Sequence, residues 1–461
     1  MLRAATARTD ITPPVGIAHA NWGAATHEQA EEVDLPLWAT ALVLETDQDE
    51  PVAVVDLDLL QLPTSLCAQV RARVSALAGI PRERIRISWT HTHSGPTLST
   101  STWVRGGVDM VEPYVRALPD RIAGIVWQAR RRTRPVEMRQ ARGECRVNVN
   151  RRLRLPDGRI VVGQNPDGFV DPSVLLLRFD GEAGPITVVS YACHPTIMAH
   201  RNRLITPDYP GVVKRVVETA VGGHCLFLQG AAGNQCSIED LTSDRESYRR
   251  IGSVIGHEAA RLAWACITPP RPMRFDRVVE SGAPLGLFRY EAGSPGAARV
   301  AVLERPVKLP ARRLPPISEL RERFERAAAH LEALRQKGAG AEEIRDATFR
   351  AKRASHLLRL AETTGGAEEV EVPVHLLRIG DVALVGLPVE PFAEIGAAIR
   401  EASPFPVTWV SGYTNGVMGY LPTRAAFQEG GYEVDTSPFT AEAEERLVAG
   451  VLALLDELRR R

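Results

Sequence analysis

The stretch THTHSGP, residues 90–96, follows the apolar run IRISW, residues 85–89, and the rest of the chain is organised around it. The apolar run predicts a short buried strand, and the Gly-Pro pair at the end of the stretch predicts a turn. At strand spacing, the imidazoles of His91 and His93 would point to the same face. The pair is therefore either two hydrogen-bonded histidines at a strand end or part of a metal site.

The composition is that of an ordinary globular protein. The 461 residues are 44% hydrophobic and 24% charged, and the formal net charge is +0, so we expect no nucleic-acid partner. No apolar stretch approaches the roughly 18–20 residues that cross a bilayer, and the first residues lack the apolar core of a secretion signal. The six cysteines form no CxxC pair, which favours reduced thiols. We expect a cytoplasmic protein of undefined oligomeric state.

Apolar runs and helical periodicity alternate along the chain and predict an α/β fold, with a mixed β-sheet core flanked by helices. We expect residues 1–268 to form the N-terminal part of one catalytic domain, which residues 370–461 complete. Between them, residues 269–369 predict a linker and an inserted hairpin of two charged helices, 317–336 and 341–362, that serve packing rather than chemistry. Residues 1–36 predict irregular structure, and we find no internal repeat.

Two more polar residues follow apolar runs and precede turns that contain proline, namely His194 and Glu390. In an open α/β sheet, strand ends of one polarity meet at one edge, where binding sites are commonly built. Two histidines and a carboxylate would leave one zinc position open for water, although no compact motif such as HExxH joins them. Asp56 and Asp58 also end an apolar run. They either cap a turn or orient a ligating imidazole, and we count Asp58 among the substrate-binding candidates.

Motifs in order from residue 10 to about residue 435 resemble those of the neutral/alkaline non-lysosomal ceramidases, in their N-terminal catalytic part. The motifs are DITPP (10–14), THTHSGP (90–96), Asn150-Arg151, ACHPT (192–196), PDYPG (207–211), QGAAGN (229–234), LPVEPF (387–392), and Gly419-Tyr420 with GYE (431–433). A match to this many separate motifs in order is specific, whereas no single motif would be.

The resemblance implies a site and a reaction. A zinc ion would be held by His91, His194, Glu390 and Tyr420. Beside it, His93 and Arg151 would handle the substrate carbonyl and the developing oxyanion. His93 belongs to the residue type that titrates near neutrality, so it would pass a proton to the leaving amine. The expected function is zinc-dependent hydrolysis of an amide C–N bond by metal-activated water.

The chain also departs from the family. The substrate-contacting turn, Gly-Asp-x-Ser-Pro-Asn in the family, reads GNQCSI at residues 233–238, so Asn234 and Cys236 replace Asp and Ser. Both are substrate-binding candidates, and Cys236 is either a nucleophile or a small buried thiol. We expect a divergent member without the family's secretion signal and C-terminal immunoglobulin-like domain, acting on a smaller or different acyl amide. The alternatives are an esterase or lactonase with the same zinc site, and a non-catalytic ligand-binding relative.

Overall fold

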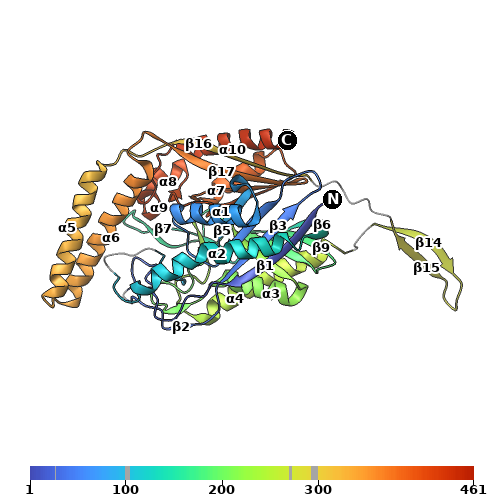
Figure 1. Ribbon diagram of the computed structural model, residues 1–461, viewed down its shortest axis with the longest axis horizontal. Coiled ribbons are helices and arrows are strands. Elements are labelled where there is room, and N and C mark those ends of the chain that lie inside the picture. The colour runs from blue at the N-terminus through green and yellow to red at the C-terminus, as the bar shows by residue number, and fades with distance from the viewer. Residues whose placement is uncertain (26, 99–103, 269–271, 292–298) are drawn as a thin grey trace.

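The structure is a computed structural model that describes residues 1–25, 27–98, 104–268, 272–291 and 299–461 (Figure 1). Within these residues the chain has the predicted α/β fold, in which mixed sheets carry helices on their outer faces. No helix of the described residues is long and apolar enough to cross a bilayer. The predicted boundary residues Pro269, Pro270 and Arg271 lie outside the described ranges.

One topology occurs three times, although the sequence shows no repeat. Each unit has three antiparallel strands, then a helix, then a fourth strand parallel to the third. The first unit comprises β1 (Arg3–Asp10), β3 (Trp38–Glu45), β4 (Val52–Leu57), α1 (Thr64–Ala78) and β5 (Ile85–Trp89). The second comprises β6 (Arg134–Glu144), β9 (Ser173–Gly181), β10 (Ile186–Tyr191), α3 (Tyr209–Val221) and β12 (His224–Gln229). The third comprises β16 (Val300–Pro310), β17 (Glu369–Ile379), β18 (Val382–Gly386), α7 (Ala393–Ala402) and β20 (Val407–Ser411).

The units assemble into four layers. Strands β1 and β6 pair, so the first two units form one eight-stranded sheet, and the third unit forms a four-stranded sheet. The two sheets face each other across a buried apolar cluster that includes Leu42 and Leu226 from the larger sheet and Leu384 and Trp409 from the smaller. The outer helices are α1, α2 (Val111–Arg130), α3 and α4 (Arg245–Ala265) on the larger sheet, and α7 and α10 (Ala443–Arg460) on the smaller.

The prediction that residues 1–36 are irregular is wrong for β1, which lies near the middle of the eight-stranded sheet. It pairs with β3 along its whole length, from Arg3 opposite Glu45 to Asp10 opposite Trp38. Its buried positions are alanines, which are depleted in strands, so the usual signal of β-branched or aromatic residues is missing. The pairing with β3 stabilises a strand that its own composition does not predict.

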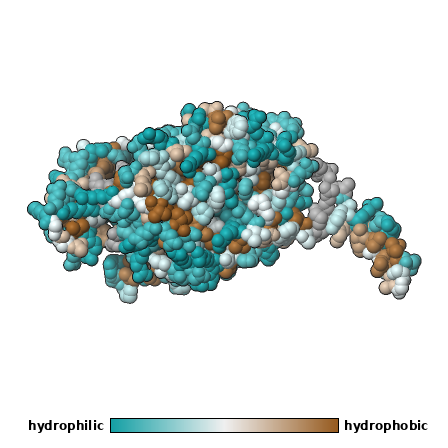
Figure 2. Space-filling view, turned by 60° about the horizontal axis from the view of Figure 1, so that its bottom comes forward, coloured by the Kyte–Doolittle hydropathy of each residue, from teal (hydrophilic) through white to brown (hydrophobic). Residues whose placement is uncertain are grey.

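The predicted helical hairpin is confirmed as α5 (Ile317–Gln336) and α6 (Ala341–Thr364), which lie between β16 and β17. A second, unpredicted hairpin of β14 (Met273–Val279) and β15 (Leu285–Tyr290) projects from the body as an arm (Figure 1). Figure 2 shows hydrophobic surface along this arm, where the exposed apolar side chains include those of Phe275, Val278 and Phe288.

Short elements complete the described chain around the strand ends. They are β2 (Glu32–Val33), the 3₁₀ turns Arg82–Arg84 and Val108–Met110, β7 (Asn148–Arg154), β8 (Ile160–Asn165), β11 (Leu204–Ile205), β13 (Gln235–Ser237), β19 (Glu390–Pro391), β21 (Tyr420–Leu421), α8 (Arg424–Glu429) and α9 (Tyr432–Asp435). Pairing of β19 with β21 sets Glu390 opposite Tyr420. Two residues far apart in sequence are thereby fixed side by side.

Candidate metal site

The THTHSGP stretch is a loop and does not continue strand β5. The strand ends at Trp89, and His91 has a left-handed backbone with φ of 68°. The N–H of His91 donates to the carbonyl of Leu59 at 3.0 Å, which ties the loop to the end of β4. Strand alternation therefore does not align the two histidines, contrary to the prediction. Their rings still lie edge to face, with centroids 5.0 Å apart.

Three histidines and two oxygen donors converge at this loop. One ring nitrogen each of His91, His93 and His194 can be chosen so that all three lie within 4.8 Å of one another, a possible metal site. The Oε2 atom of Glu390 lies 3.1 Å from Nε2 of His194 and 3.5 Å from Nε2 of His91. The hydroxyl of Tyr420 lies 3.5 Å from Nε2 of His194. Ligands placed about 2.0–2.1 Å from zinc at tetrahedral corners stand about 3.3–3.4 Å apart, close to these spacings.

Two of the histidines are oriented by backbone carbonyls. Nδ1 of His91 lies 2.8 Å from the carbonyl oxygen of Leu60, and Nδ1 of His194 lies 2.6 Å from that of Ala232. A carbonyl can only accept, so Nδ1 carries the proton in both rings and Nε2 keeps its lone pair. Metal-binding histidines are commonly held in this way.

His93 is half-buried between Trp22 and the other histidines. Both of its ring nitrogens are buried and lack a hydrogen-bond partner among the described residues. The ring packs on that of Trp22, with centroids 4.9 Å apart. Buried polar atoms are nearly always paired, so these nitrogens fit a metal ion or a substrate group. The geometry therefore admits His93 as a ligand as well as in the predicted catalytic role.

Burial keeps the histidines neutral. It lowers the pKa of His91 and His194 to about 4 and that of His93 to about 3, so the near-neutral titration expected for His93 does not hold. Neutral imidazole is the form that binds metals. Burial alone would raise the pKa of Glu390, but its interactions with the His91 and His194 rings and with the Arg151 cation lower it far below its usual range. Burial raises the pKa of the Tyr420 hydroxyl well above 10.

Arg151 brings a buried cation to the cluster. From β7, its Nη2 donates to the hydroxyl of Tyr420 at 3.0 Å and its Nε donates to Oε1 of Glu433 at 2.8 Å. Nη1 of the neighbouring Arg152 donates to Oε2 of Glu433 at 2.9 Å. Glu433 thus holds two buried guanidinium groups, a role we did not predict although the residue belongs to the GYE motif.

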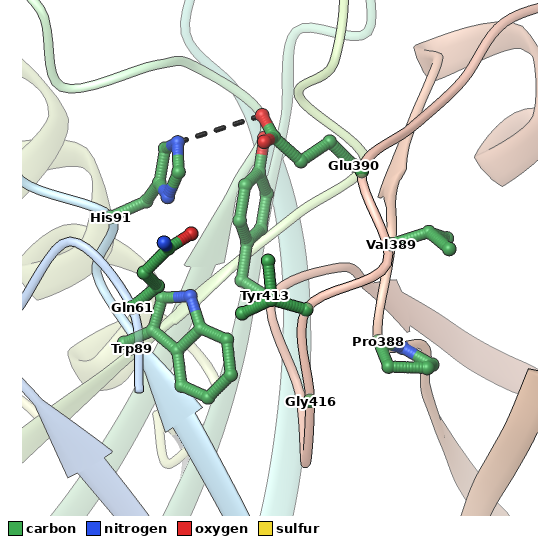
Figure 3. A pocket seen from close by; sticks show the side chains of 10 residues that line it. Gln61, Trp89, His91, Pro388, Val389, Glu390, Tyr413 and Gly416 are labelled. Atoms are coloured by element: carbon green, nitrogen blue, oxygen red, sulfur yellow. Dashed lines mark ion pairs between the residues drawn. The ribbon is translucent and has the colours of Figure 1, made fainter. Parts of the chain in front are cut away.

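Tyr413 is a second residue that the sequence prediction missed. Its ring lies 4.4 Å from that of His91 between centroids, and its buried hydroxyl has no hydrogen-bond partner among the described residues. Figure 3 shows this side chain rising toward Glu390 beside a small cavity, whose lining also includes Gln61 and Trp89. Its backbone has a φ of 56°, a strained conformation that no sequence pattern predicts.

The three substrate-binding candidates each hydrogen-bond another protein group. Asp58 is fully buried, where Oδ1 accepts from Nζ of Lys214 at 2.7 Å and Oδ2 from the N–H of Trp38 at 3.0 Å. Both oxygens of this carboxylate are therefore occupied by protein groups, and the substrate contact of Asp58 stays a prediction. Oδ1 of Asn234 accepts from the N–H of Ala393 at the start of α7 at 2.9 Å.

The surroundings of Asn234 and Cys236 differ. Asn234 also lines a separate polar cavity together with Asn150 and Arg152. The thiol of Cys236 is fully buried and donates to the carbonyl of Gly163 at 3.5 Å. Burial raises the pKa of this thiol well above its usual value, so it stays protonated at neutral pH. The structure therefore favours the buried-thiol interpretation over a nucleophile.

The buried histidines predict that the metal-free protein loses stability in mild acid. The unfolded chain binds protons below about pH 6.5, whereas His91, His93 and His194 in the fold bind them only near pH 4 or below. The free energy of unfolding therefore falls as pH falls from about 6.5 toward 4, by an amount on the order of 1–2 kcal/mol for each imidazole at pH 5. Urea unfolding of chelator-treated protein at pH 7 and pH 5 measures this loss. A His93→Gln variant should show a smaller loss, and an equal loss would contradict the assignment.

The sequence is similar to those of a known protein family and of several named proteins. Residues 3–232 match the family described as neutral/alkaline non-lysosomal ceramidase, N-terminal. Neutral ceramidase 1 of Arabidopsis thaliana is 28% identical over 274 residues, which are 55% of this chain and 33% of that protein. The neutral ceramidase of Pseudomonas aeruginosa is 29% identical over 215 residues, 43% of this chain and 31% of that protein. These alignments span about a third of each curated relative.

Solved structures extend the similarity to the whole fold. A ceramidase complexed with C2 superposes with a TM-score of 0.70 at 19% identity, covering 100% of this chain and 75% of the other. The crystal structure of neutral ceramidase from Pseudomonas aeruginosa gives 0.68 at 21% identity, covering 99% and 75%. At this level of identity the agreement is one of fold.

Proposed function

Because the chain belongs to the neutral/alkaline non-lysosomal ceramidase family, we propose that it is a zinc-dependent hydrolase of an acyl amide. The observation that carries the proposal is the position of Glu390, whose Oε2 lies 3.1 Å and 3.5 Å from the Nε2 atoms of His194 and His91. With Tyr420, whose hydroxyl lies 3.5 Å from Nε2 of His194, these residues offer two nitrogens and two oxygens, a donor set that suits zinc.

The residues around the metal position have separate roles in the proposed reaction. Bound zinc would polarise the scissile carbonyl and lower the pKa of a water molecule. Arg151 holds a positive charge in a water-poor site, where it stabilises the oxyanion that develops on the carbonyl oxygen. The neutral ring of His93 has one donor and one acceptor nitrogen without hydrogen-bond partners among the described residues, so it can hydrogen-bond the attacking water and the leaving amine and hold them in position.

We propose a short acyl amide as substrate, within the lipid amides that the family implies. The support is that Asn234 and Cys236 replace the Asp and Ser of the turn that contacts substrate in the family. A zinc ion held by the same residues would also suit hydrolysis of an ester or a lactone. The experiment therefore varies both the leaving group and the length of the acyl chain.

The test combines metal analysis with a substrate panel. Purified protein should contain one zinc ion per chain, and chelation should abolish hydrolysis that zinc restores. The panel pairs amides and esters of the same acyl groups, from short chains to long N-acyl lipids. Greater kcat/KM for short amides supports the proposal. Preference for esters would favour the esterase alternative, and zinc binding without turnover of any compound would favour a ligand-binding relative.

Replacing Cys236 by alanine should leave zinc content unchanged and kcat/KM within about threefold of the parent. The thiol is protonated and donates to Gly163, so it supplies no nucleophile. Cys225→Ala, in strand β12, is a matched control for the loss of one buried sulfur. Loss of turnover in Cys236→Ala alone, with zinc still bound, would instead establish thiol chemistry.

A further inference from the structure

The inserted hairpin contacts the loop that covers the histidine cluster. Nζ of Lys352, on α6, donates to the carbonyl of Gly23 at 2.9 Å and to that of Trp22 at 3.4 Å. The ring of Trp22 in turn packs on the ring of His93. A single residue therefore separates α6 from the candidate metal site. Figure 1 agrees, because α6 is the helix of the hairpin that faces the body and α5 lies outside it.

Helix α5 contacts the chain segments that precede and follow the THTHSGP loop. Arg335 lies 3.9 Å from Oε1 of Glu28, and Glu332 forms an ion pair with Arg105. Oε2 of Glu28 accepts from the N–H groups of Arg105 at 3.0 Å and Gly106 at 2.7 Å. The hairpin is thus tied to segments on both sides of the THTHSGP loop, which fixes α6 over the site.

His356 lies one turn beyond Lys352 on α6, at the i,i+4 spacing that puts both on one helix face. Its Nδ1 lies 2.7 Å from Nη2 of Arg359. A guanidinium only donates, so Nδ1 accepts and the ring proton is on Nε2. This Nε2 is buried and has no hydrogen-bond partner among the described residues. A buried donor without an acceptor is costly, and an oxygen atom of a bound ligand would satisfy it.

The contacts of Lys352 with Gly23 and Trp22 place this face of α6 toward the site, and electrostatic effects agree. The carboxylate of Glu390 acts on the pKa of His356, in opposition to the larger effect of burial, which lowers that pKa to about 4. The charge of Arg359 similarly acts on Tyr432, whose ring lies 5.7 Å from that of Tyr420 between centroids. Both effects agree with a position of His356 and Arg359 on the side of α6 that the Lys352 contacts turn toward the site.

We propose that α6 forms a wall of the substrate site and that His356 donates its Nε2–H to a hydroxyl or carbonyl oxygen of the substrate away from the scissile amide. The proposal rests on the amide hydrolysis proposed above and adds a feature of the substrate, namely a second oxygen in the acyl or amine part. In this role His356 determines specificity and does not bind the metal.

The test uses three matched amides, one unsubstituted, one with a hydroxyl on the amine part and one with a hydroxyl on the acyl part. His356→Leu removes the donor, His356→Gln keeps an N–H at a similar reach, and His330→Leu removes an exposed histidine of the same hairpin. The readouts are zinc content, kcat/KM, and the Kd of each amide for chelator-treated protein measured by calorimetry.

We expect His356→Leu to lower kcat/KM and to raise Kd about tenfold for one hydroxylated amide only, with zinc content unchanged. His356→Gln should recover most of the loss, and His330→Leu should resemble the parent. An equal loss for all three amides, or no loss for any, would overturn the proposal. If the parent protein bound the amides without hydrolysing them, the proposed reaction would be refuted. The role of α6 as a wall of the site would still be tested, because the Kd values report the contact between His356 and the hydroxyl. Failure of the parent to bind either hydroxylated amide would overturn the wall itself.

Discussion

Replacing His194 by alanine will yield a folded protein that has lost its zinc and more than about 10³-fold of its kcat/KM. His194 is fully buried, and its Nε2 is the nearest ring nitrogen to Oε2 of Glu390. Removal of the ring deletes one donor and leaves the buried carboxylate without that partner, so the remaining donors hold a metal poorly. Loss of the metal removes both the polarised carbonyl and the activated water, which accounts for the size of the effect.

Metal content measured by mass spectrometry, alongside kcat/KM and far-UV circular dichroism, checks this result. His257→Ala is the matched control, because His257 is exposed on α4 and outside the histidine cluster. His93→Ala is the informative comparison. If it keeps zinc and loses turnover, His93 is catalytic, and if it loses zinc, it is a ligand. Full zinc occupancy in His194→Ala would contradict the proposed ligand set.

The second large effect is expected from Glu433→Gln, as a loss of stability. The carboxylate of Glu433 is 1% exposed and pairs with Arg151 and Arg152, whose side chains are 5% and 6% exposed. Neutralising it leaves two buried guanidinium groups without their shared counter-charge. Breaking a buried pair in this way costs about 3–5 kcal/mol. We also expect at least about a tenfold loss of kcat, because Arg151 loses the partner that aims it at Tyr420.

Urea unfolding of the parent and variant measures the first effect, and steady-state kinetics of the zinc-loaded protein measure the second. The control is Glu429→Gln. Glu429 pairs with Arg152 and Arg154, but its side chain is 39% exposed, so its loss should cost less than about 1 kcal/mol. Equal losses of unfolding free energy in Glu433→Gln and Glu429→Gln would show that burial does not strengthen the contribution of Glu433 to stability.

The parts of the site that follow strands could be predicted from the sequence. His194 and Glu390 each follow a continuous apolar run, and strands β10 and β18 were found at these runs. The packing of the two sheets then brings these strand ends together. This arrangement depends on the topology of the whole fold, which a local sequence pattern does not determine. The resemblance added Tyr420 and Arg151, which no spacing rule would select.

The remaining residues depend on tertiary contacts that leave no local signature. Tyr413 and Glu433 belong to the site because they contact His91 and Arg151 in the folded chain. His356 lies on a helix whose charged sequence pattern resembles that of an ordinary solvent-exposed helix. His91 has a left-handed backbone at a position where alternation predicted a strand. Strand β1 was missed for a similar reason, since its stability comes from pairing with β3 and not from its alanines.

The division of the fold into three units has a consequence for biosynthesis. His91 follows the last strand of the first unit and His194 follows the third strand of the second, whereas Glu390 lies within the third unit and Tyr420 follows it. A ribosome would release the first two units while the oxygen donors were still unmade, so the nascent chain would hold only a partial, histidine-only site. Zinc capture would then wait for the third unit, and truncated chains would fail to load. Metal retention in cell extracts would thereby distinguish finished molecules from incomplete ones.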